Sequence, residues 1–367
     1  MKRLLITGGA GFIGANFCHY WSGKYPADRL VVLDALTYAG NPASIASLIE
    51  HERVRFVHDD IIECDRVTAL LREERIDTVV NFAAESHVDR SIEDPQSFLR
   101  TNVMGTHALL EAARSAWSRP SSESYRFHHV STDEVYGSLG PEDSAFTEQT
   151  AYAPNSPYSA SKAAADHLVR AYGRTYGLPC TISNCSNNYG PYQFPEKLLP
   201  LCIVNILEGR ALPVYGDGLQ VRDWLHVSDH CRAVDLILSA SVAGETWNIG
   251  GSSNDCNLKI VESICELIDA AFASEPELAN RFPRNVLASG RPSRSLIQHV
   301  RDRPGHDRRY AVDAGKIARL GFKPQTSLTT GLAATVRWYL ENETWWRSIV
   351  SGEYRRWYER QYARASQ

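Results

Sequence analysis

Short apolar runs alternate with helical patterns through the first half of the chain. Runs rich in Leu, Ile and Val predict strands at Lys2–Thr7, Leu30–Asp34, Val54–His58, Thr78–Phe82, Arg126–Ser131 and Thr181–Asn184. Apolar residues at helical spacing predict helices at Phe12–Lys24, Asp65–Glu74, Pro95–Ala116 and Ser159–Tyr176. Strands that alternate with helices are typical of a parallel sheet with helices on both faces. We therefore expect an α/β protein with a Rossmann-type, doubly wound sheet.

The pattern changes after about residue 190, where prolines crowd together and turn signals such as Gly216-Asp217-Gly218 separate shorter elements. We expect residues 1–190 to form the sheet domain and residues 191–367 a smaller α/β substrate-binding domain, with later segments crossing back. Residues 272–300 are polar and poorly periodic, which predicts a long surface insertion. The aromatic residues of the tail predict that it packs on the body; they are Trp338, Tyr339, Trp345, Trp346, Trp357 and Tyr358.

Composition narrows the class of protein. Of 367 residues, 43% are hydrophobic and 22% charged, and the net charge of -4 argues against a general nucleic-acid binder. Gly8 and Gly9 interrupt the first apolar run too early for a signal peptide, and no stretch approaches the roughly 18 apolar residues of a membrane helix. The eight cysteines are scattered without a Cys-x-x-Cys pair, so we expect free thiols, a cytoplasmic protein and no metal site.

A glycine motif follows the first predicted strand. The spacing Gly8-x-x-Gly11-x-x-Gly14 occurs in any tight strand-to-helix turn, but here it ends a strand and opens a helix that includes Phe12 and Ile13. Such a turn lets backbone N–H groups and the helix N-terminus hold a pyrophosphate. Asp34 ends the second strand, ahead of Ala35, Leu36 and Thr37, and its carboxylate suits ribose hydroxyls but would repel a 2′-phosphate. The prediction is NAD rather than NADP.

Other strand ends supply further cofactor candidates. Asp60 and Ile61 follow the third strand, where such folds meet an adenine, and Ala83, Ala84, Glu85 and Ser86 follow the fourth. Tyr158 and Lys162 are spaced i, i+4 on a predicted helix, so their side chains share one face. A nearby ammonium and the positive nicotinamide would lower the pKa of Tyr158 and make it a base.

Two adjacent carboxylic residues, Asp133 and Glu134, follow the fifth strand directly after Ser131-Thr132. They are either a solvated turn or an acid and base beside the redox pair. An acidic pair next to a hydride acceptor would be poorly solvated and costly in a plain dehydrogenase. Its presence is understandable if the reaction also transfers protons, with one carboxyl protonated and its neighbour ionised.

Longer segments carry a family resemblance. The chain resembles the extended short-chain dehydrogenase/reductase superfamily and, within it, the dTDP-glucose 4,6-dehydratases. The segments that match are Phe82–Ser91, Ser131–Gly137, Ser183–Tyr192, Phe194–Leu198, Arg222–Trp224 and Asp302–Asp307. The resemblance covers nearly the whole chain, and its clearest departure is the 272–300 segment, which is longer than is usual in the family.

The resemblance implies an internal redox cycle with NAD. Tyr158 removes the C4 hydroxyl proton while the hydride passes to NAD, Lys162 holds the ribose, and Thr132 hydrogen-bonds the same hydroxyl. Glu134 then takes the C5 proton, Asp133 protonates the departing C6 hydroxyl, and the hydride returns to C6. The product is a 4-keto-6-deoxy sugar.

The resemblance also implies the binding residues and the oligomer. Further cofactor residues would be Thr101, Asn102 and Asn188. The nucleotide-diphosphate hexose, dTDP-glucose, would be bound by His87, Thr132, Asn187, Lys197, Leu198, Pro213, Val214, Tyr215, Arg222, Asn257, Asp302, Arg303, Pro304, Gly305 and His306. A homodimer formed through helices 95–116 and 159–176 is expected.

Other functions share part of the pattern. A dehydratase of UDP- or CDP-hexoses, a nucleotide-sugar 4-epimerase and a uronic-acid decarboxylase would all keep the glycines, Tyr158 and Lys162. An epimerase needs no acid and base at C5 and C6, so Asp133 and Glu134 argue against it. A silent NAD-binding regulator would be expected to lack one of these side chains.

Overall fold

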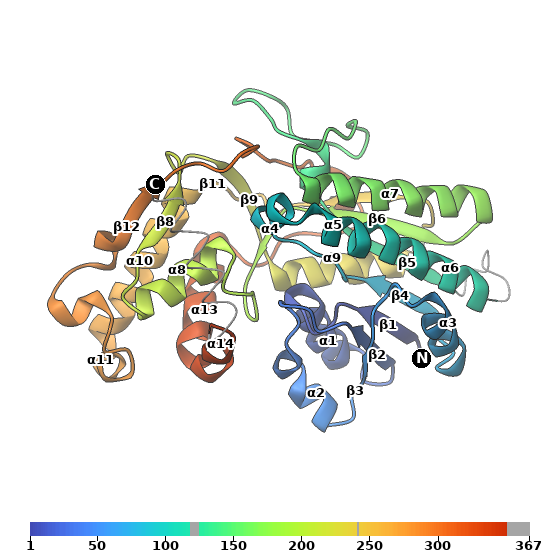
Figure 1. Ribbon diagram of the computed structural model, residues 1–367, viewed down its shortest axis with the longest axis horizontal. Coiled ribbons are helices and arrows are strands. Elements are labelled where there is room, and N and C mark those ends of the chain that lie inside the picture. Colours follow the sequence, from blue (N-terminus) through green and yellow to red (C-terminus); the bar gives the residue numbers. More distant parts are fainter. Residues whose placement is uncertain (118–124, 241, 351–367) are drawn as a thin grey trace.

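Seven parallel strands form the central sheet, in the order β10-β6-β5-β4-β1-β2-β3 (Figure 1). The computed structural model describes residues 1–117, 125–240 and 242–350. The strands are β1 (Arg3–Thr7), β2 (Arg29–Asp34), β3 (Val54–His58), β4 (Thr78–Asn81), β5 (Arg126–Thr132), β6 (Cys180–Cys185) and β10 (Thr246–Ile249). The predicted doubly wound Rossmann-type sheet is confirmed. The edge strand β10 comes from late in the chain, which returns to the sheet after leaving it.

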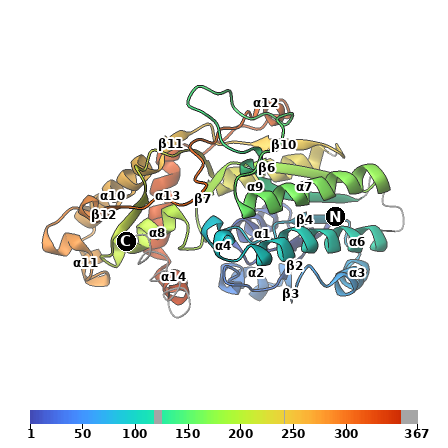
Figure 2. The same cartoon turned by 45° about the horizontal axis from the view of Figure 1, so that its top comes forward.

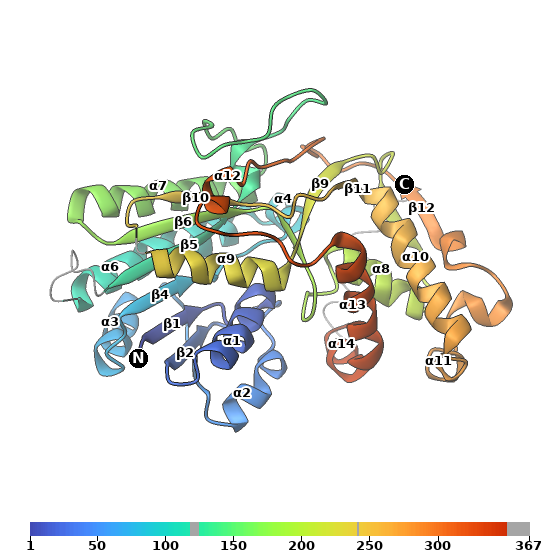
Figure 3. The ribbon, with the colours of Figure 1, turned by 180° about the vertical axis from the view of Figure 1, so that it is seen from behind.

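Helices cover both faces of this sheet. One layer holds α3 (Cys64–Glu73), α6 (Thr106–Ala116) and α7 (Pro157–Tyr176), and the other α1 (Phe12–Lys24), α2 (Ala46–Glu50) and α9 (Val227–Ala240). Successive residues of β1 divide between the layers: Leu5 packs with the first, while Leu4 and Ile6 pack with the second. Figure 3 shows α1 and α9 side by side on the second face. Both faces of the strands are therefore buried, as a parallel sheet requires.

The helix predicted over 95–116 is continuous but not uniform. It begins as α5 (Pro95–Phe98), widens into a π-helical segment at Leu99–Gly105 and ends as α6. A short helix, α4 (Val88–Glu93), precedes it. Such widened turns are frequent at functional sites, and this one carries the predicted cofactor residues Thr101 and Asn102.

A second unit lies beside the sheet and has a core of its own (Figure 2). It holds the three-stranded sheet β11-β9-β7 and the strand pair β12-β8. Its strands are β7 (Asn187–Tyr189), β8 (Leu212–Tyr215), β9 (Val221–His226), β11 (Asn254–Cys256) and β12 (Ile297–Val300). Its helices are α8 (Leu198–Leu207), α10 (Asn257–Ser274), α11 (Glu277–Arg281), α13 (Leu328–Glu341) and α14 (Glu343–Ile349), while α12 (Gly315–Ala318) packs on β10.

The expectation of a surface insertion over 272–300 is wrong. The segment carries α11 and strand β12, which pairs in parallel with β8. Leu278 and Phe282 are buried in the core of the second unit, and Phe282 stacks near the fully buried Trp346 of α14. Only a few, irregularly spaced apolar residues anchor this segment to the core. Its sequence therefore shows no helical or strand periodicity that would predict these elements. The aromatic tail packs on the body as far as residue 350, and Trp357 and Tyr358 lie outside the described residues.

The structure adds three general observations. All eight cysteines are free thiols. No helix in the described part of the chain combines the length and apolar character needed to cross a membrane. Across those same residues, no group of three His, Cys, Asp or Glu side chains is arranged to hold a metal ion.

We predict that Phe282→Ala lowers the free energy of unfolding by about 3–5 kcal/mol, because it removes a fully buried aromatic ring from the core of the second unit. Arg291→Ala is the matched control: its side chain is exposed in the same segment, and the change should cost within about 0.5 kcal/mol. Denaturant unfolding measures both. If both substitutions lowered the free energy of unfolding by equally small amounts, residues 272–300 would be a surface loop, as first expected.

Candidate active site

A cavity of about 290 Å³ opens at the carboxyl ends of β1, β2, β3, β4, β5 and β6, where ligands bind in open α/β sheets. Six strands therefore deliver their following residues to one place. Of the predicted residues, the cavity is lined by Gly8, Gly11, Phe12, Ile13, Gly14, Asp34, Ala35, Thr37, Asp60, Ile61, Ala83, Ala84, Glu85, Ser86, Thr101, Thr132, Asp133, Glu134, Tyr158, Lys162, Asn187, Asn188 and Lys197.

The glycine turn is closed too tightly for other residues. Gly8 has φ of +67°, and a Cβ there would lie 2.6 Å from the backbone nitrogen of Ala83. A Cβ on Gly14 would collide with the Gly8 carbonyl oxygen. Gly11 is the N-cap of α1 and no side chain caps the helix, so its first N–H groups face the cavity without a local acceptor. These residues fit a pyrophosphate held on backbone N–H groups.

Asp34 is anchored by backbone N–H groups on both sides. Its Oδ2 accepts from the Ala10 amide at 2.9 Å and its Oδ1 from the Leu36 amide at 2.8 Å. Burial raises the pKa of this carboxyl, while the two backbone bonds oppose that rise. The carboxylate is thus fixed at the end of β2 with lone pairs left for hydroxyl donors. Leu36 serves through its backbone and does not line the cavity.

Asn102 also lies behind the cavity rather than on its wall. Its Oδ1 accepts from the Glu85 amide at 2.9 Å, and its Nδ2 donates to the Glu85 carbonyl at 3.0 Å and to Ser161 Oγ at 2.8 Å. These bonds tie the loop after β4 to helix α7. Asn102 therefore shapes the wall that Glu85 presents.

The turn after β5 holds the predicted acid and base. Thr132 caps a 3-10 turn, Asp133–Tyr136, because its hydroxyl accepts from the Glu134 amide at 3.2 Å. The same hydroxyl donates to Asp133 Oδ1 at 3.3 Å. Asp133 is 1% exposed, and its Oδ2 has no hydrogen-bond partner among the described residues.

The surroundings of Asp133 and Glu134 affect the ionisation of the two carboxyl groups differently. Burial raises the pKa of Asp133 well above its usual value, and the neighbouring Glu134 and Asp223 raise it further. Burial also raises the pKa of Glu134, but the nearby Arg303 and Lys197 favour its ionised form. Its surroundings thus favour the neutral form of Asp133, whereas cations next to Glu134 favour the ionised form of that residue.

Helix α7 brings Tyr158 and Lys162 to the same cavity. A capping box between Ser156 and Ser159 fixes where the helix begins. Burial raises the pKa of Tyr158 well above 10, and the Glu134 carboxylate adds to the rise, while a hydrogen bond with Thr132 opposes it. These directions hold for the chain without NAD, whereas the expected lowering of the Tyr158 pKa includes the positive nicotinamide and stays a prediction. The Lys162 ammonium donates to the Val130 carbonyl at 2.7 Å.

Cations from the second unit converge on the acid-base pair. Arg222 of β9 is buried, donates to the Asp307 carbonyl at 2.9 Å and lies 4.2 Å over the Tyr310 ring. Arg303, after β12, donates to Asp89 Oδ1 at 3.3 Å. Both favour the ionised form of Glu134. The two units thus contribute opposite charges to one site.

The other predicted substrate residues lie outside the wall of the cavity. Those that do not line the cavity are His87, Leu198, Pro213, Val214, Tyr215, Arg222, Asn257, Asp302, Arg303, Pro304, Gly305 and His306. Tyr215 donates to Asp89 Oδ2 at 3.0 Å, and His306 bonds Asp302 at 2.6 Å. His87 Nε2 donates to the Glu196 carbonyl at 3.3 Å, which favours the packing role over contact with the sugar. The Val214 side chain belongs to the core of the second unit.

Sequence reasoning missed several lining residues: Leu33, Ala39, Gly40, Phe82, Gln193, Phe194 and Glu196, with Val130, Ser131, Cys185 and Ser186 at the ends of β5 and β6. Glu196 is the most informative, since it is buried and pairs with Arg90 of α4 at 2.9 Å. Its position beside Lys197, inside a segment that carries the resemblance, was the available signal.

The comparisons with known proteins agree with this geometry. The family model described as GDP-mannose 4,6 dehydratase matches residues 5–335. The dTDP-glucose 4,6-dehydratase of Xanthomonas campestris pv. campestris (strain B100) is 54% identical, over 97% of this chain and 98% of that protein. That of Shigella flexneri is 50% identical, over 98% and 99%.

Solved structures give the same family. The dTDP-glucose 4,6-dehydratase of Streptomyces venezuelae, crystallised with NAD bound, superposes with a TM-score of 0.82 at 47% identity, over 95% of this chain and all of that one. A UDP-glucuronic acid 4-epimerase from Bacillus cereus superposes with a TM-score of 0.78 at 28% identity, over 93% of this chain and all of its own. These relatives account for the combination of the glycine turn, the Tyr158/Lys162 helix and the Asp133-Glu134 pair in one site. The chain belongs to the dTDP-glucose 4,6-dehydratase family.

Proposed function

We propose that this protein removes water from dTDP-glucose to give dTDP-4-keto-6-deoxyglucose, with NAD as a cofactor that ends unchanged. The observation that carries the proposal is the carboxyl pair after β5, in which Asp133 is buried with one oxygen that has no hydrogen-bond partner among the described residues, while cations favour ionised Glu134. An oxidoreductase alone would not need it. NAD, when bound, accepts the C4 hydride and gives it back at C6.

Three side chains serve the oxidation at C4. Tyr158 receives the proton of the C4 hydroxyl, and Thr132, which hydrogen-bonds Tyr158, orients that hydroxyl. Lys162 holds the cofactor ribose and supplies positive charge beside the phenol. Since burial and Glu134 raise the pKa of Tyr158, positive charge brought into this cavity is what makes its deprotonation feasible.

The acid-base pair serves the elimination. A ketone at C4 makes the C5 proton acidic, and Glu134 takes it. Asp133 gives its proton to the C6 hydroxyl, which leaves as water. After the hydride has returned to C6, Glu134 returns a proton to C5. The proton that Tyr158 took from the C4 hydroxyl passes, directly or through water, to Asp133, so that all three groups are reset and only water is lost in total. Mutual repulsion between adjacent carboxylates keeps the two roles apart.

The second unit supplies the nucleotide site. Lys197, Arg222 and Arg303 bring positive charge toward the cavity, and a guanidinium suits the paired oxygens of a diphosphate. We assign the nucleotide and its diphosphate to the surrounding predicted residues: Asn187, Leu198, Pro213, Val214, Tyr215, Asn257, Asp302, Pro304, Gly305 and His306. The Val214 contribution would come from its backbone, because its side chain is buried in the core.

A 4-epimerase is the second candidate, because an epimerase from Bacillus cereus shares the fold. Epimerisation at C4 requires no group to protonate a leaving hydroxyl at C6. The buried, neutral Asp133 would then be an unpaired polar cost without use. The dehydratase accounts for this residue and the epimerase does not.

The direct test of the function is turnover. Purified protein incubated with dTDP-glucose should produce the alkali-stable chromophore of a 4-keto sugar, and UDP-glucose and CDP-glucose serve as alternative substrates. A chromophore that forms only with UDP-glucose or CDP-glucose would show that the enzyme prefers uracil or cytosine over thymine in the substrate nucleotide. No chromophore with any of the three would refute the dehydratase.

Glu134→Gln should separate the two halves of the reaction. We expect reduction of the cofactor by dTDP-glucose to persist while product formation falls by roughly 100-fold to 10,000-fold, since the amide cannot take the C5 proton. Nicotinamide absorbance and the chromophore assay measure the two steps. Tyr158→Phe is the comparison, because it should slow the reduction itself. Parent-rate turnover in Glu134→Gln would show that the base is another group.

We also propose that the protein is a cytoplasmic homodimer. Its free thiols suit a reducing compartment. Leu99 and Met104, on the π-helical segment, are each 54% exposed, and Ile92 and Tyr176 are exposed on α4 and α7. Apolar side chains on these neighbouring helices form the kind of surface that a second copy covers.

A charge placed on that surface tests the dimer. Met104→Glu should shift the protein toward monomer in sedimentation velocity, because a dimer would bury the carboxylate twice. Leu219→Glu, at a residue 46% exposed on the second unit, should leave the mass unchanged. A parent protein that sediments as a monomer at assay concentrations would contradict the proposal.

A further inference from the structure

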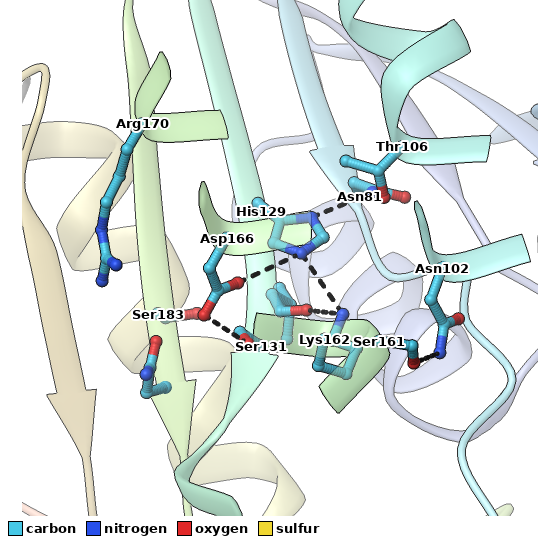
Figure 4. A network of polar contacts seen from close by, with 12 residues as sticks. Asn81, Asn102, Thr106, His129, Ser131, Ser161, Lys162, Asp166, Arg170 and Ser183 are labelled. Carbon is cyan, nitrogen blue, oxygen red and sulfur yellow. Dashed lines mark hydrogen bonds and ion pairs between the residues drawn. The ribbon is translucent and has the colours of Figure 1, made fainter. Parts of the chain in front are cut away.

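A buried polar chain stands behind Lys162 that the proposed reaction does not use. It joins Asn81 of β4, His129 of β5 and Asp166 of α7 (Figure 4). The His129 ring lies between Asn81 on one side and Asp166 and Lys162 on the other. All of these side chains are almost completely buried. Buried ionisable groups are costly, so an arrangement that pairs them off requires an explanation.

Asn81 fixes the protonation of His129. The Thr7 hydroxyl donates to Asn81 Oδ1 at 2.6 Å, which leaves Asn81 Nδ2 as the donor to His129 Nδ1 at 3.0 Å. An accepting Nδ1 puts the imidazole proton on Nε2. Burial lowers the pKa of His129 far below its usual value, so the ring stays neutral. The Nε2–H then points to the space between Lys162 and Asp166.

Asp166 holds the negative charge of this space. Its Oδ2 accepts from Ser131 Oγ and from the Tyr152 hydroxyl, each at 2.9 Å. Its Oδ1 has no hydrogen-bond partner in the described part of the chain, and lies 3.5 Å from His129 Nε2. Lys162 Nζ lies 3.3 Å from that same nitrogen. One carboxylate oxygen is thus left aimed at the imidazole that stands next to the ammonium.

We propose that Asp166 is a positioning residue that acts through Lys162, its carboxylate keeping the Lys162 ammonium charged and His129 keeping it turned to the cofactor cavity. The Val130 carbonyl takes one of the three ammonium protons, at 2.7 Å. His129 presents an N–H there and so cannot accept another, which leaves the remaining donors for the cavity that Lys162 lines. This inference rests on the proposed role of Lys162 in holding NAD.

The electrostatics agree with the geometry. The titratable groups that face Lys162 are Asp166 on its own helix, His129 on β5 and Cys185 on β6. Burial lowers the pKa of Lys162 to about 8, and the Asp166 carboxylate opposes that fall. Burial raises the pKa of Asp166 to about 6, so the carboxylate is ionised at neutral pH. Removing its charge should therefore let the Lys162 pKa fall further, and the ammonium should be lost at lower pH.

The experiment follows the cofactor rather than turnover. Holoenzyme is passed through gel filtration at a series of pH values, and the NAD that stays with the protein is measured. The parent should lose NAD as pH rises through the Lys162 titration. In Asp166→Asn the loss should move down by about one pH unit or more. Asp166→Ser is a second neutral variant and should show the same downward shift. It replaces Asp166→Asn in the experiment if that variant does not fold.

Two controls distinguish charge from structure. Asp166→Glu keeps a carboxylate and should keep the parent profile, while Tyr152→Phe removes a hydrogen bond to Asp166 without removing the charge and should leave the alkaline loss in place. Weaker NAD retention at every pH, with an unshifted profile in the neutral variants, would overturn the proposal. If the profile shifts as expected but dTDP-glucose is not dehydrated, the proposed function fails and the role of Asp166 stands.

Discussion

One hydrogen bond, from the Glu134 amide to the Thr132 hydroxyl, closes the turn on which the chemistry depends. It ends β5 abruptly and leaves Asp133 facing inward without a partner for one of its oxygens. Burial in that position favours the neutral form of Asp133, while nearby cations favour the ionised form of Glu134. The same backbone turn therefore places the proposed acid and the proposed base on two adjacent residues.

That turn works only because two units meet at it. The sheet contributes the carboxyl groups and Tyr158, and the second unit contributes Arg222 and Arg303, which favour the ionised form of Glu134. Those cations oppose the rise that burial causes in the pKa of Glu134, and so favour the form in which Glu134 could act as a base. An anionic nucleotide that engages the same cations is thereby brought next to the acid-base pair.

The buried network behind Lys162 follows the same physical rule. Charge in a dry interior is kept where it is needed by a second charge nearby and by donors that fix its orientation. Asp166 favours the charged form of Lys162, with His129 between them. Arg222 and Arg303 favour the charged form of Glu134 in the same way. In each case a group proposed to act on substrate or cofactor has its charge favoured by charged groups close to it.

The sequence alone determined the sheet, the glycine turn, Asp34 and the Tyr158/Lys162 face, because these depend on local periodicity and on strand ends that a parallel sheet gathers at one edge. Residues 272–300 were misjudged, since their few apolar residues acquire meaning only against the core they complete. The resemblance implied Asp133 as the acid and Glu134 as the base, and only the tertiary structure supplies a physical reason for that proposal. Burial and distant cations set a pKa, and chain order does not specify which of two neighbours they will surround.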